Sequence, residues 1–208
     1  MRLNPCALLM ALLLLAGLAG CQSSEEEIEA FLDSARTLHD QGDDEKAILQ
    51  LRNVLQRDGA NAEANFMMAE YYEGKRDWPR MLGHLEQVIK SDSGSIPARL
   101  KIARLMLMQN ELDSAAQQVA AVEAQEPGNT QAMMLRGVLV VREGDQKGGL
   151  ELAKLAFLAD SSSIEIVGAY ASMLMATGNA SEAAVVILQA LESRPDDKTL
   201  GVLLFQAY

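Results

Sequence analysis

Apolar and small side chains recur along most of this chain at a fixed interval of 34 residues. The blocks that align without insertion begin at Ile28, Ala62, Ile96, Thr130 and Ile164. In every block the eighth residue is small: Ala35, Ala69, Ala103, Gly137 and Ala171. A register that is kept over this length indicates a repeat architecture. We therefore expect five repeats, over residues 28–61, 62–95, 96–129, 130–163 and 164–197.

Further positions of each repeat carry side chains suited to helix packing. The twentieth residues are Ala47, Met81, Ala115, Gly149 and Ala183, and the twenty-seventh are Val54, Val88, Val122, Ala156 and Ala190. Position 24 holds Leu51, Leu85, Val119, Ala153 and Ile187. Small residues let two antiparallel helices approach closely, and the side chain at position 24 fills the space between them. The pattern predicts a pair of packed helices in each repeat.

Turn residues recur in phase with this packing pattern. The fifteenth position holds Gly42, Asn110, Gly144 and Gly178, which suit a left-handed helix end, with Arg76 as the exception. The next position offers four N-cap residues, Asp43, Asp77, Asp145 and Asn179, and Pro79 suits a first helical turn. Position 32 carries the helix breakers Pro127 and Pro195, with Gly59, Ser93 and Ser161 in the other repeats. Each repeat is therefore predicted to be helix, turn, helix.

A 34-residue period with small residues at positions 8 and 20 and a breaker at position 32 resembles the tetratricopeptide repeat (TPR). The resemblance implies an all-α solenoid of antiparallel helix pairs that winds into a right-handed superhelix. Local departures are Asn65 and Arg99 at position 4 and Ser34 and Arg136 at position 7, where the family usually has apolar residues. The alternative is an unrelated helical bundle, which has no reason to keep one register five times.

Residues 198–208 start a sixth block, which we interpret as the beginning of a sixth repeat or an incomplete cap. This segment, KTLGVLLFQAY, is almost entirely apolar, whereas a solenoid requires a polar outer surface on its last repeat. We favour the interpretation that the chain is the N-terminal part of a longer array. The alternative is that the apolar segment meets a partner.

The N-terminus has the pattern of an export signal. Arg2 precedes an apolar run over 7–18, and twelve residues cover only ~18 Å of a hydrocarbon core that is about 30 Å thick. The run ends in Leu18-Ala19-Gly20-Cys21, which resembles the lipobox of bacterial lipoproteins. This resemblance implies a cleaved signal peptide over 1–20, a lipidated tether over 21–27 and acyl chains on Cys21 that anchor the protein to a membrane.

The alternative for this segment is an ordinary signal peptide that is cut after Ala19 or Gly20. If the lipobox is used, Gln22 is not the Asp that retains many lipoproteins in the inner membrane. We therefore expect an outer-membrane anchor with the protein on the periplasmic face, and the inner membrane stays open because sorting rules differ between bacteria.

Composition excludes several classes of function. A net charge of −11 leaves no basic surface for nucleic acid, and an aromatic content of 4% disfavours ring-stacking sites. Cys6 and Cys21 belong to the apolar N-terminal segment, so a cysteine-based metal site is not expected. The two histidines, His39 and His84, lie in different repeats and are interpreted as surface residues. No nucleotide-binding or hydrolase motif is present, so we expect no enzyme activity, no cofactor and no metal.

In TPR proteins, positions 2, 5, 9, 12 and 13 line the concave surface. The first two repeats place mostly charged residues there, including Glu29, Arg36, Glu63 and Glu70. The later repeats place a largely apolar set there: Leu100, Arg104, Leu107, Met108, Met134, Val138, Val141, Arg142 and Met175. We interpret this set as a partner-binding surface. The alternative is that the apolar stripe belongs to the core.

The first two repeats, over SARTLHDQGDDEKAILQLRNVLQRDGANAEANFMMAEYY, also resemble the opening of the TPR lipoproteins associated with PEP-CTERM/exosortase sorting and exopolysaccharide export. We therefore expect a lipid-anchored periplasmic scaffold that binds a protein or peptide partner in the cell envelope. Its processes would be envelope assembly, protein sorting or exopolysaccharide secretion. A purely structural envelope module and a glycan-binding or enzyme accessory are the alternatives. The oligomeric state stays open.

Overall fold

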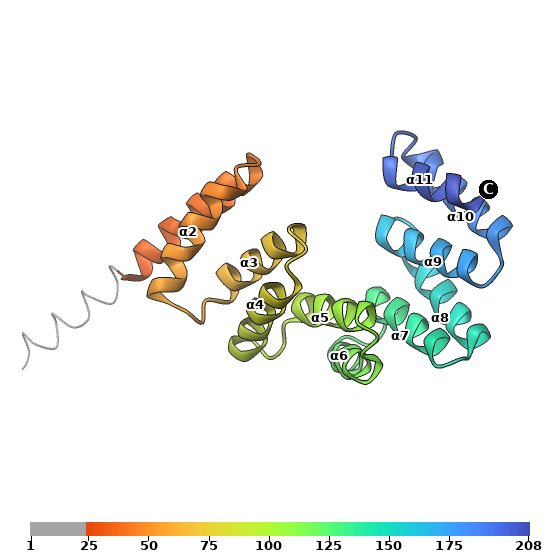
Figure 1. The fold of residues 1–208 in the computed structure, drawn as a ribbon, viewed down its shortest axis with the longest axis horizontal. Coiled ribbons are helices and arrows are strands. Elements are labelled where there is room, and N and C mark those ends of the chain that lie inside the picture. The colour runs from red at the N-terminus through yellow and green to blue at the C-terminus, as the bar shows by residue number, and fades with distance from the viewer. Residues whose placement is uncertain (1–23) are drawn as a thin grey trace, which may run out of the picture. The chain divides into compact units, whose positions relative to one another are not determined.

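A computed structural model describes residues 24–208, and every regular element in this range is an α-helix (Figure 1). The predicted signal peptide and Cys21 lie outside the described residues. The first helix covers residues 24–40. The others are α2 (Asp44–Arg57), α3 (Ala62–Gly74), α4 (Trp78–Ser91), α5 (Ile96–Met108), α6 (Leu112–Gln125), α7 (Thr130–Arg142), α8 (Gln146–Ala159), α9 (Ile164–Ala176), α10 (Ala180–Ser193) and α11 (Lys198–Ala207). The all-α prediction is confirmed.

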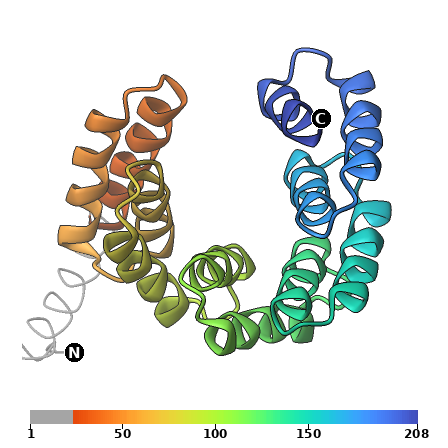
Figure 2. The same cartoon turned by 45° about the vertical axis from the view of Figure 1, so that its right-hand side comes forward.

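The helices alternate between two kinds. First helices α3, α5, α7 and α9 begin at the residues where the sequence blocks begin, and each is followed by a second helix that packs against it. The chain divides into two compact units between Ser95 and Ile96, where the third block starts. In the second unit, drawn green to blue in Figure 2, antiparallel helix pairs follow one another. The last helix, α11, packs on α9 and α10 as the first helix of a further pair would. None of the helices in 24–208 is both long enough and apolar enough to span a bilayer.

The turn between the two helices of each repeat has the same left-handed conformation. All five residues at position 15 have positive φ, including Arg76 at 56° and Asn110 at 62°, so the turn prediction is confirmed even where the residue is not glycine. In the second repeat, the amide of Asp77 donates to the carbonyl of Tyr72 at 2.9 Å, which is the closing bond of a Schellman motif. The hydrogen bonds of the turn thus hold Arg76 in the left-handed conformation, which costs a non-glycine residue about 1–2 kcal/mol.

Three of the four predicted N-caps bond as expected. Asp43, Asp77 and Asp145 each accept a hydrogen bond from the amide three residues ahead. Asn179 was expected to do the same, and that expectation is wrong: its side chain makes no cap, and its Nδ2 donates to Oγ1 of Thr177 at 3.1 Å. A cap would use Oδ1 of Asn179 as an acceptor, whereas the side chain is held through its Nδ2, which donates to the Thr177 hydroxyl.

The close approach of paired helices is tightest in the fourth repeat. A Cβ at Gly137 would lie 2.8 Å from the carbonyl oxygen of Gly149, and a Cβ at Gly149 would lie 2.5 Å from the carbonyl oxygen of Gly137. The other repeats place fully buried alanines at position 8, such as Ala103 and Ala171. The backbones of α7 and α8 therefore come into direct contact at these two glycines, with the Val141 side chain packed beside them.

One polar side chain is buried in the core of the described residues. Asn65, which is 2% exposed, donates its two amide hydrogens to the carbonyls of Gly59 and Asn61 at 3.1 and 2.9 Å. Its Oδ1 must then accept, so His84 carries its proton on Nδ1, 2.9 Å away. The His84 ring also stacks on Tyr72, with centroids 5.5 Å apart. The interpretation of His84 as a surface histidine is therefore wrong, because Asn65 and Tyr72 hold it half-buried.

We predict that Gly149→Ala destabilises the protein and that Gly83→Ala stabilises it. The methyl group in the first variant meets backbone atoms that cannot move aside, at a cost of about 1–3 kcal/mol. A Cβ at exposed Gly83, inside α4, meets nothing within 4 Å, so the gain in helix propensity of about 0.5–1 kcal/mol remains. Denaturant unfolding followed by circular dichroism measures the unfolding free energy of both variants. Changes of the same sign in the two variants would refute the close approach.

We also predict a pH dependence of stability that comes from His84. Burial lowers the pKa of His84 below its ordinary value of 6.5, so the unfolded state binds more protons in the region between the two values. This contribution to stability is complete above pH 6.5 and is lost as the pH falls through the lower, folded-state pKa. His84→Gln can still donate to Asn65 but does not titrate. The loss in unfolding free energy between pH 7.5 and 5.5 should be smaller in this variant, and equal losses would contradict the prediction.

Candidate protein-interaction groove

A cavity of about 260 Å³ opens among the first helices of the third, fourth and fifth repeats. We call it the α5/α7/α9 groove, and its lining is Arg104, Leu107, Met108, Gln131, Met134, Leu135, Val138, Glu165, Ile166 and Ala169. The central helix α7 packs against both α5 and α9, so the three helices form one continuous surface within the second unit. Most of the lining side chains are apolar, and the polar ones come from Arg104, Gln131 and Glu165.

The groove brings together five of the nine residues that the sequence assigned to a partner-binding surface. They are Arg104, Leu107, Met108, Met134 and Val138. The other four do not line the groove. Leu100 is buried, and Val141 and Met175 pack against the core of the last repeats. Arg142 is exposed, and its Nη1 donates a hydrogen bond to Oδ1 of Asn110 at 3.3 Å. The structure thus divides the predicted set between a groove, a core and an exposed end of α7.

The alternative that the apolar stripe belongs to the core holds for part of it. Leu107 and Met134 are buried and form the floor of the groove, and Val138 is half-buried beside them. Met108, the next residue after Leu107, is 66% exposed at the rim. The floor therefore belongs to the packed interior of the second unit, while its upper surface and Met108 remain accessible from the groove. Binding of a partner by these residues stays a prediction.

One side of the groove is a polar wall. Nη2 of Arg104, on α5, contacts Oε1 of Glu165, on α9, and the Nε2 of Gln131, on α7, donates to Oε2 of Glu165 at 3.2 Å. The ion pair thus connects the third and fifth repeats across the helix of the fourth. Its two side chains are 31% and 49% exposed, in that order, so the carboxylate is the more accessible partner.

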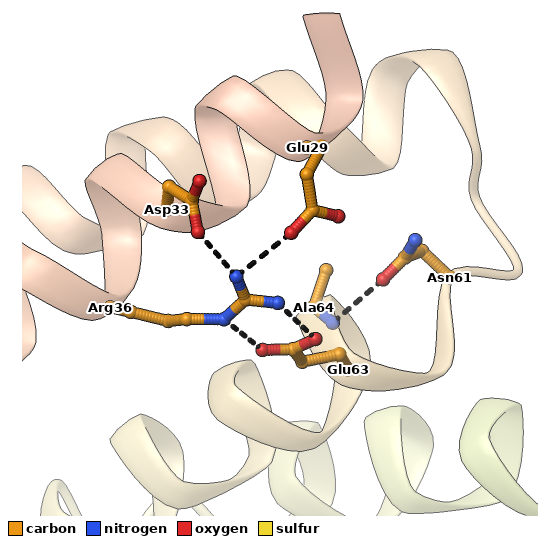
Figure 3. Close-up of polar contacts among 6 residues, drawn as sticks. All are labelled: Glu29, Asp33, Arg36, Asn61, Glu63 and Ala64. Atoms are coloured by element: carbon orange, nitrogen blue, oxygen red, sulfur yellow. Dashed lines mark hydrogen bonds and ion pairs between the residues drawn. The ribbon is translucent and has the colours of Figure 1, made fainter. Parts of the chain in front are cut away.

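In the first unit the corresponding positions form a charged cluster, which Figure 3 shows. Arg36, on the first helix, binds both carboxylate oxygens of Glu63, on α3, at 2.6 and 2.7 Å. It also donates to Glu29 at 2.9 Å and to Asp33 at 2.6 Å. The hydrogen bond from Arg36 lowers the pKa of Glu63, and the bond to Glu63 raises the pKa of Arg36. These charges join the first repeat to the second, and their exposure keeps the gain in stability modest.

A second cavity, of about 210 Å³, lies in the first unit and was not foreseen from the sequence. It is lined by His39, Asp44, Ala47, Ile48, Leu51, Met67, Glu70, Tyr71, Gly74 and Lys75. His39 is exposed as expected, and its Nδ1 lies 2.8 Å from Oδ1 of Asp44 at the rim. The only signal in the sequence was the adjacency of His39 to the turn. Among residues 24–208, no three His, Cys, Asp or Glu side chains are placed to hold a metal ion.

Comparisons with known proteins agree with this arrangement. Residues 82–139 match the tetratricopeptide repeat family. No curated protein matches the sequence. Among solved structures, the thermophilic TPR protein TTC0263 of Thermus thermophilus is 18% identical, with a TM-score of 0.71 over 86% of this chain and 98% of its own. MamA of Desulfovibrio magneticus RS-1, from residue 41 to its end, is also 18% identical, with a TM-score of 0.63 over 83% of this chain and 98% of its own.

A third similar structure is YrrB, described as a TPR protein with an unusual peptide-binding site. It is 14% identical, with a TM-score of 0.59 over 88% of this chain and 94% of its own. At these identities the likenesses establish the fold. Together with the 34-residue register and the five left-handed turns, they show that this chain has the all-α fold of tetratricopeptide-repeat proteins.

Proposed function

We propose that this protein is a lipid-anchored scaffold of the cell envelope that binds segments of partner proteins in the α5/α7/α9 groove. The observation that carries the proposal is the assembly of an accessible apolar floor from the first helices of three consecutive repeats. Peptide binding by a protein of the same fold, as YrrB is described, supports this use of the groove. The protein would act by holding a partner and would carry out no reaction of its own.

The dimensions of the groove favour a peptide over a small molecule. Its volume of about 260 Å³ lies below the range of roughly 300–1,000 Å³ that is usual for small-molecule sites. A space of this size suits one or two side chains of an extended or helical segment. Exposed Met108 can change rotamer at the rim, which lets one groove accept more than one apolar side chain.

The lipobox-like Leu18-Ala19-Gly20-Cys21 supports anchoring of the mature chain through Cys21. Ser24 is already helical, and the chain from Cys21 to Ser24 can span at most about 10 Å. The first repeat would therefore lie next to the lipid headgroups on the periplasmic face of the membrane. Gln22 favours the outer membrane over the inner membrane.

The process that the scaffold serves is proposed from the resemblance of the first two repeats to PEP-CTERM/exosortase-associated TPR lipoproteins. That resemblance favours protein sorting or exopolysaccharide secretion within the broader class of envelope assembly. A purely structural module has no need for an accessible apolar groove, so the groove favours the scaffold.

We predict that Met108→Asp weakens peptide binding in the groove and leaves the fold intact. Peptides would be selected from a random twelve-residue display library on the immobilised protein, and their Kd would be measured by fluorescence anisotropy. Loss of an apolar contact of about 1.5–3 kcal/mol weakens binding roughly 10- to 100-fold. The matched control is Val185→Asp on α10, outside the groove, because Val185 is 63% exposed and Met108 is 66% exposed. Selected peptides that bind both variants equally well would refute the groove as the binding site.

For the anchor, we predict that Cys21→Ser prevents lipid attachment, because this cysteine supplies the only thiol of the lipobox-like segment. Labelled palmitate supplied to the expressing cells should mark the wild-type chain and not the variant. Cys6→Ser, inside the proposed signal peptide, is the control and should label as the wild type does. Label that persists in Cys21→Ser would exclude the lipoprotein assignment.

A further inference from the structure

We propose that the α5/α7/α9 groove selects peptide segments in which an aliphatic side chain is accompanied by a Lys or Arg that pairs with Glu165. The inference rests on the proposed function and specifies the chemistry of the partner at the same site. Its basis is that one cavity holds both an apolar floor and an accessible carboxylate.

The floor and the carboxylate face the same space. Met134, Val138 and Ile166 line the cavity together with Glu165, and Glu165 directly precedes Ile166 on α9. When a peptide places one side chain on this floor, its neighbouring residues therefore lie close to the Glu165 carboxylate. Glu165 lies in the first turn of α9.

The exposures of the ion pair indicate which charge a ligand meets. The Glu165 side chain is 49% exposed and the Arg104 side chain 31%, so the carboxylate is the group turned more towards solvent. Glu165 also has oxygen lone pairs beyond the contacts with Arg104 and Gln131, because a carboxylate accepts about four hydrogen bonds. A peptide ammonium or guanidinium can therefore bind Glu165 without displacing Arg104.

The charge of the protein favours the same choice. The chain carries −11, and residues 96–208 contain 13 acidic side chains against nine basic ones. The negative electrostatic potential that results attracts cationic peptide segments and raises their association rate. An acidic segment would meet repulsion from the whole chain and from Glu165 at the groove.

The experiment compares peptide libraries on three forms of the full chain: wild type, Glu165→Gln and the control Glu192→Gln. Glu192 is an exposed acidic residue on α10 outside the groove, so its variant has the same change in net charge. Only peptides that Met108→Asp releases are analysed, because these occupy the groove. We expect wild type and Glu192→Gln to enrich Lys or Arg at a fixed spacing from an aliphatic residue, and Glu165→Gln to lose the basic residue from its consensus.

A double-mutant cycle then measures the pairing directly. For one selected peptide, replacing its Lys or Arg with Gln should raise the Kd about three- to fivefold on wild type and leave it unchanged on Glu165→Gln. Circular dichroism confirms that the variant is folded. Enrichment of Asp or Glu, a consensus without charge, or an equal loss on both proteins would each overturn this inference, while the proposed function would stand. If no selected peptide is released by Met108→Asp, the proposed function itself fails.

Discussion

The close approach of two antiparallel helices within each repeat is the constraint on which the rest of the structure depends. Alanine or glycine is buried at position 8 of every repeat and stands at position 20 of every repeat but the second, which has Met81, and Leu51, Leu85 or their equivalents fill the remaining space. This contact sets the distance between helices, and the left-handed turn sets their direction. In the second unit the first helices α5, α7 and α9 pack in series, so the groove forms on these helices without any element dedicated to it.

The order of the elements could be predicted from the sequence because it depends on local and periodic signals. First helices begin at Ala62, Ile96, Thr130 and Ile164, where the blocks begin, since turn chemistry and helix contacts repeat in every block. Arg76 shows how strong this periodicity is, because it takes the left-handed conformation without being glycine. Asn179 shows its limit, since a cap depends on which neighbour competes for the side chain.

The groove was only partly predictable, because it depends on how far each side chain is buried and not on the residue type. Leu107 and Met108 are adjacent and both apolar, yet one is buried and the other is exposed. The polar wall joins Arg104 to Glu165, which are two repeats apart in the sequence, so no local pattern reveals it. The sequence does carry a signal for the burial of His84: a polar residue at the usually apolar position of Asn65 requires a hydrogen-bonding partner.

The contact between Gly137 and Gly149 also bears on how the groove can move. At these two glycines the helix backbones meet without a Cβ between them, so α7 has little room to shift towards α8 at this point. The same α7 supplies Met134, Leu135 and Val138 to the centre of the groove. A ligand therefore meets a floor that is already in its bound shape and loses little entropy in ordering it. Adaptation to different ligands falls to the rim, where a single methionine can change rotamer without disturbing any repeat.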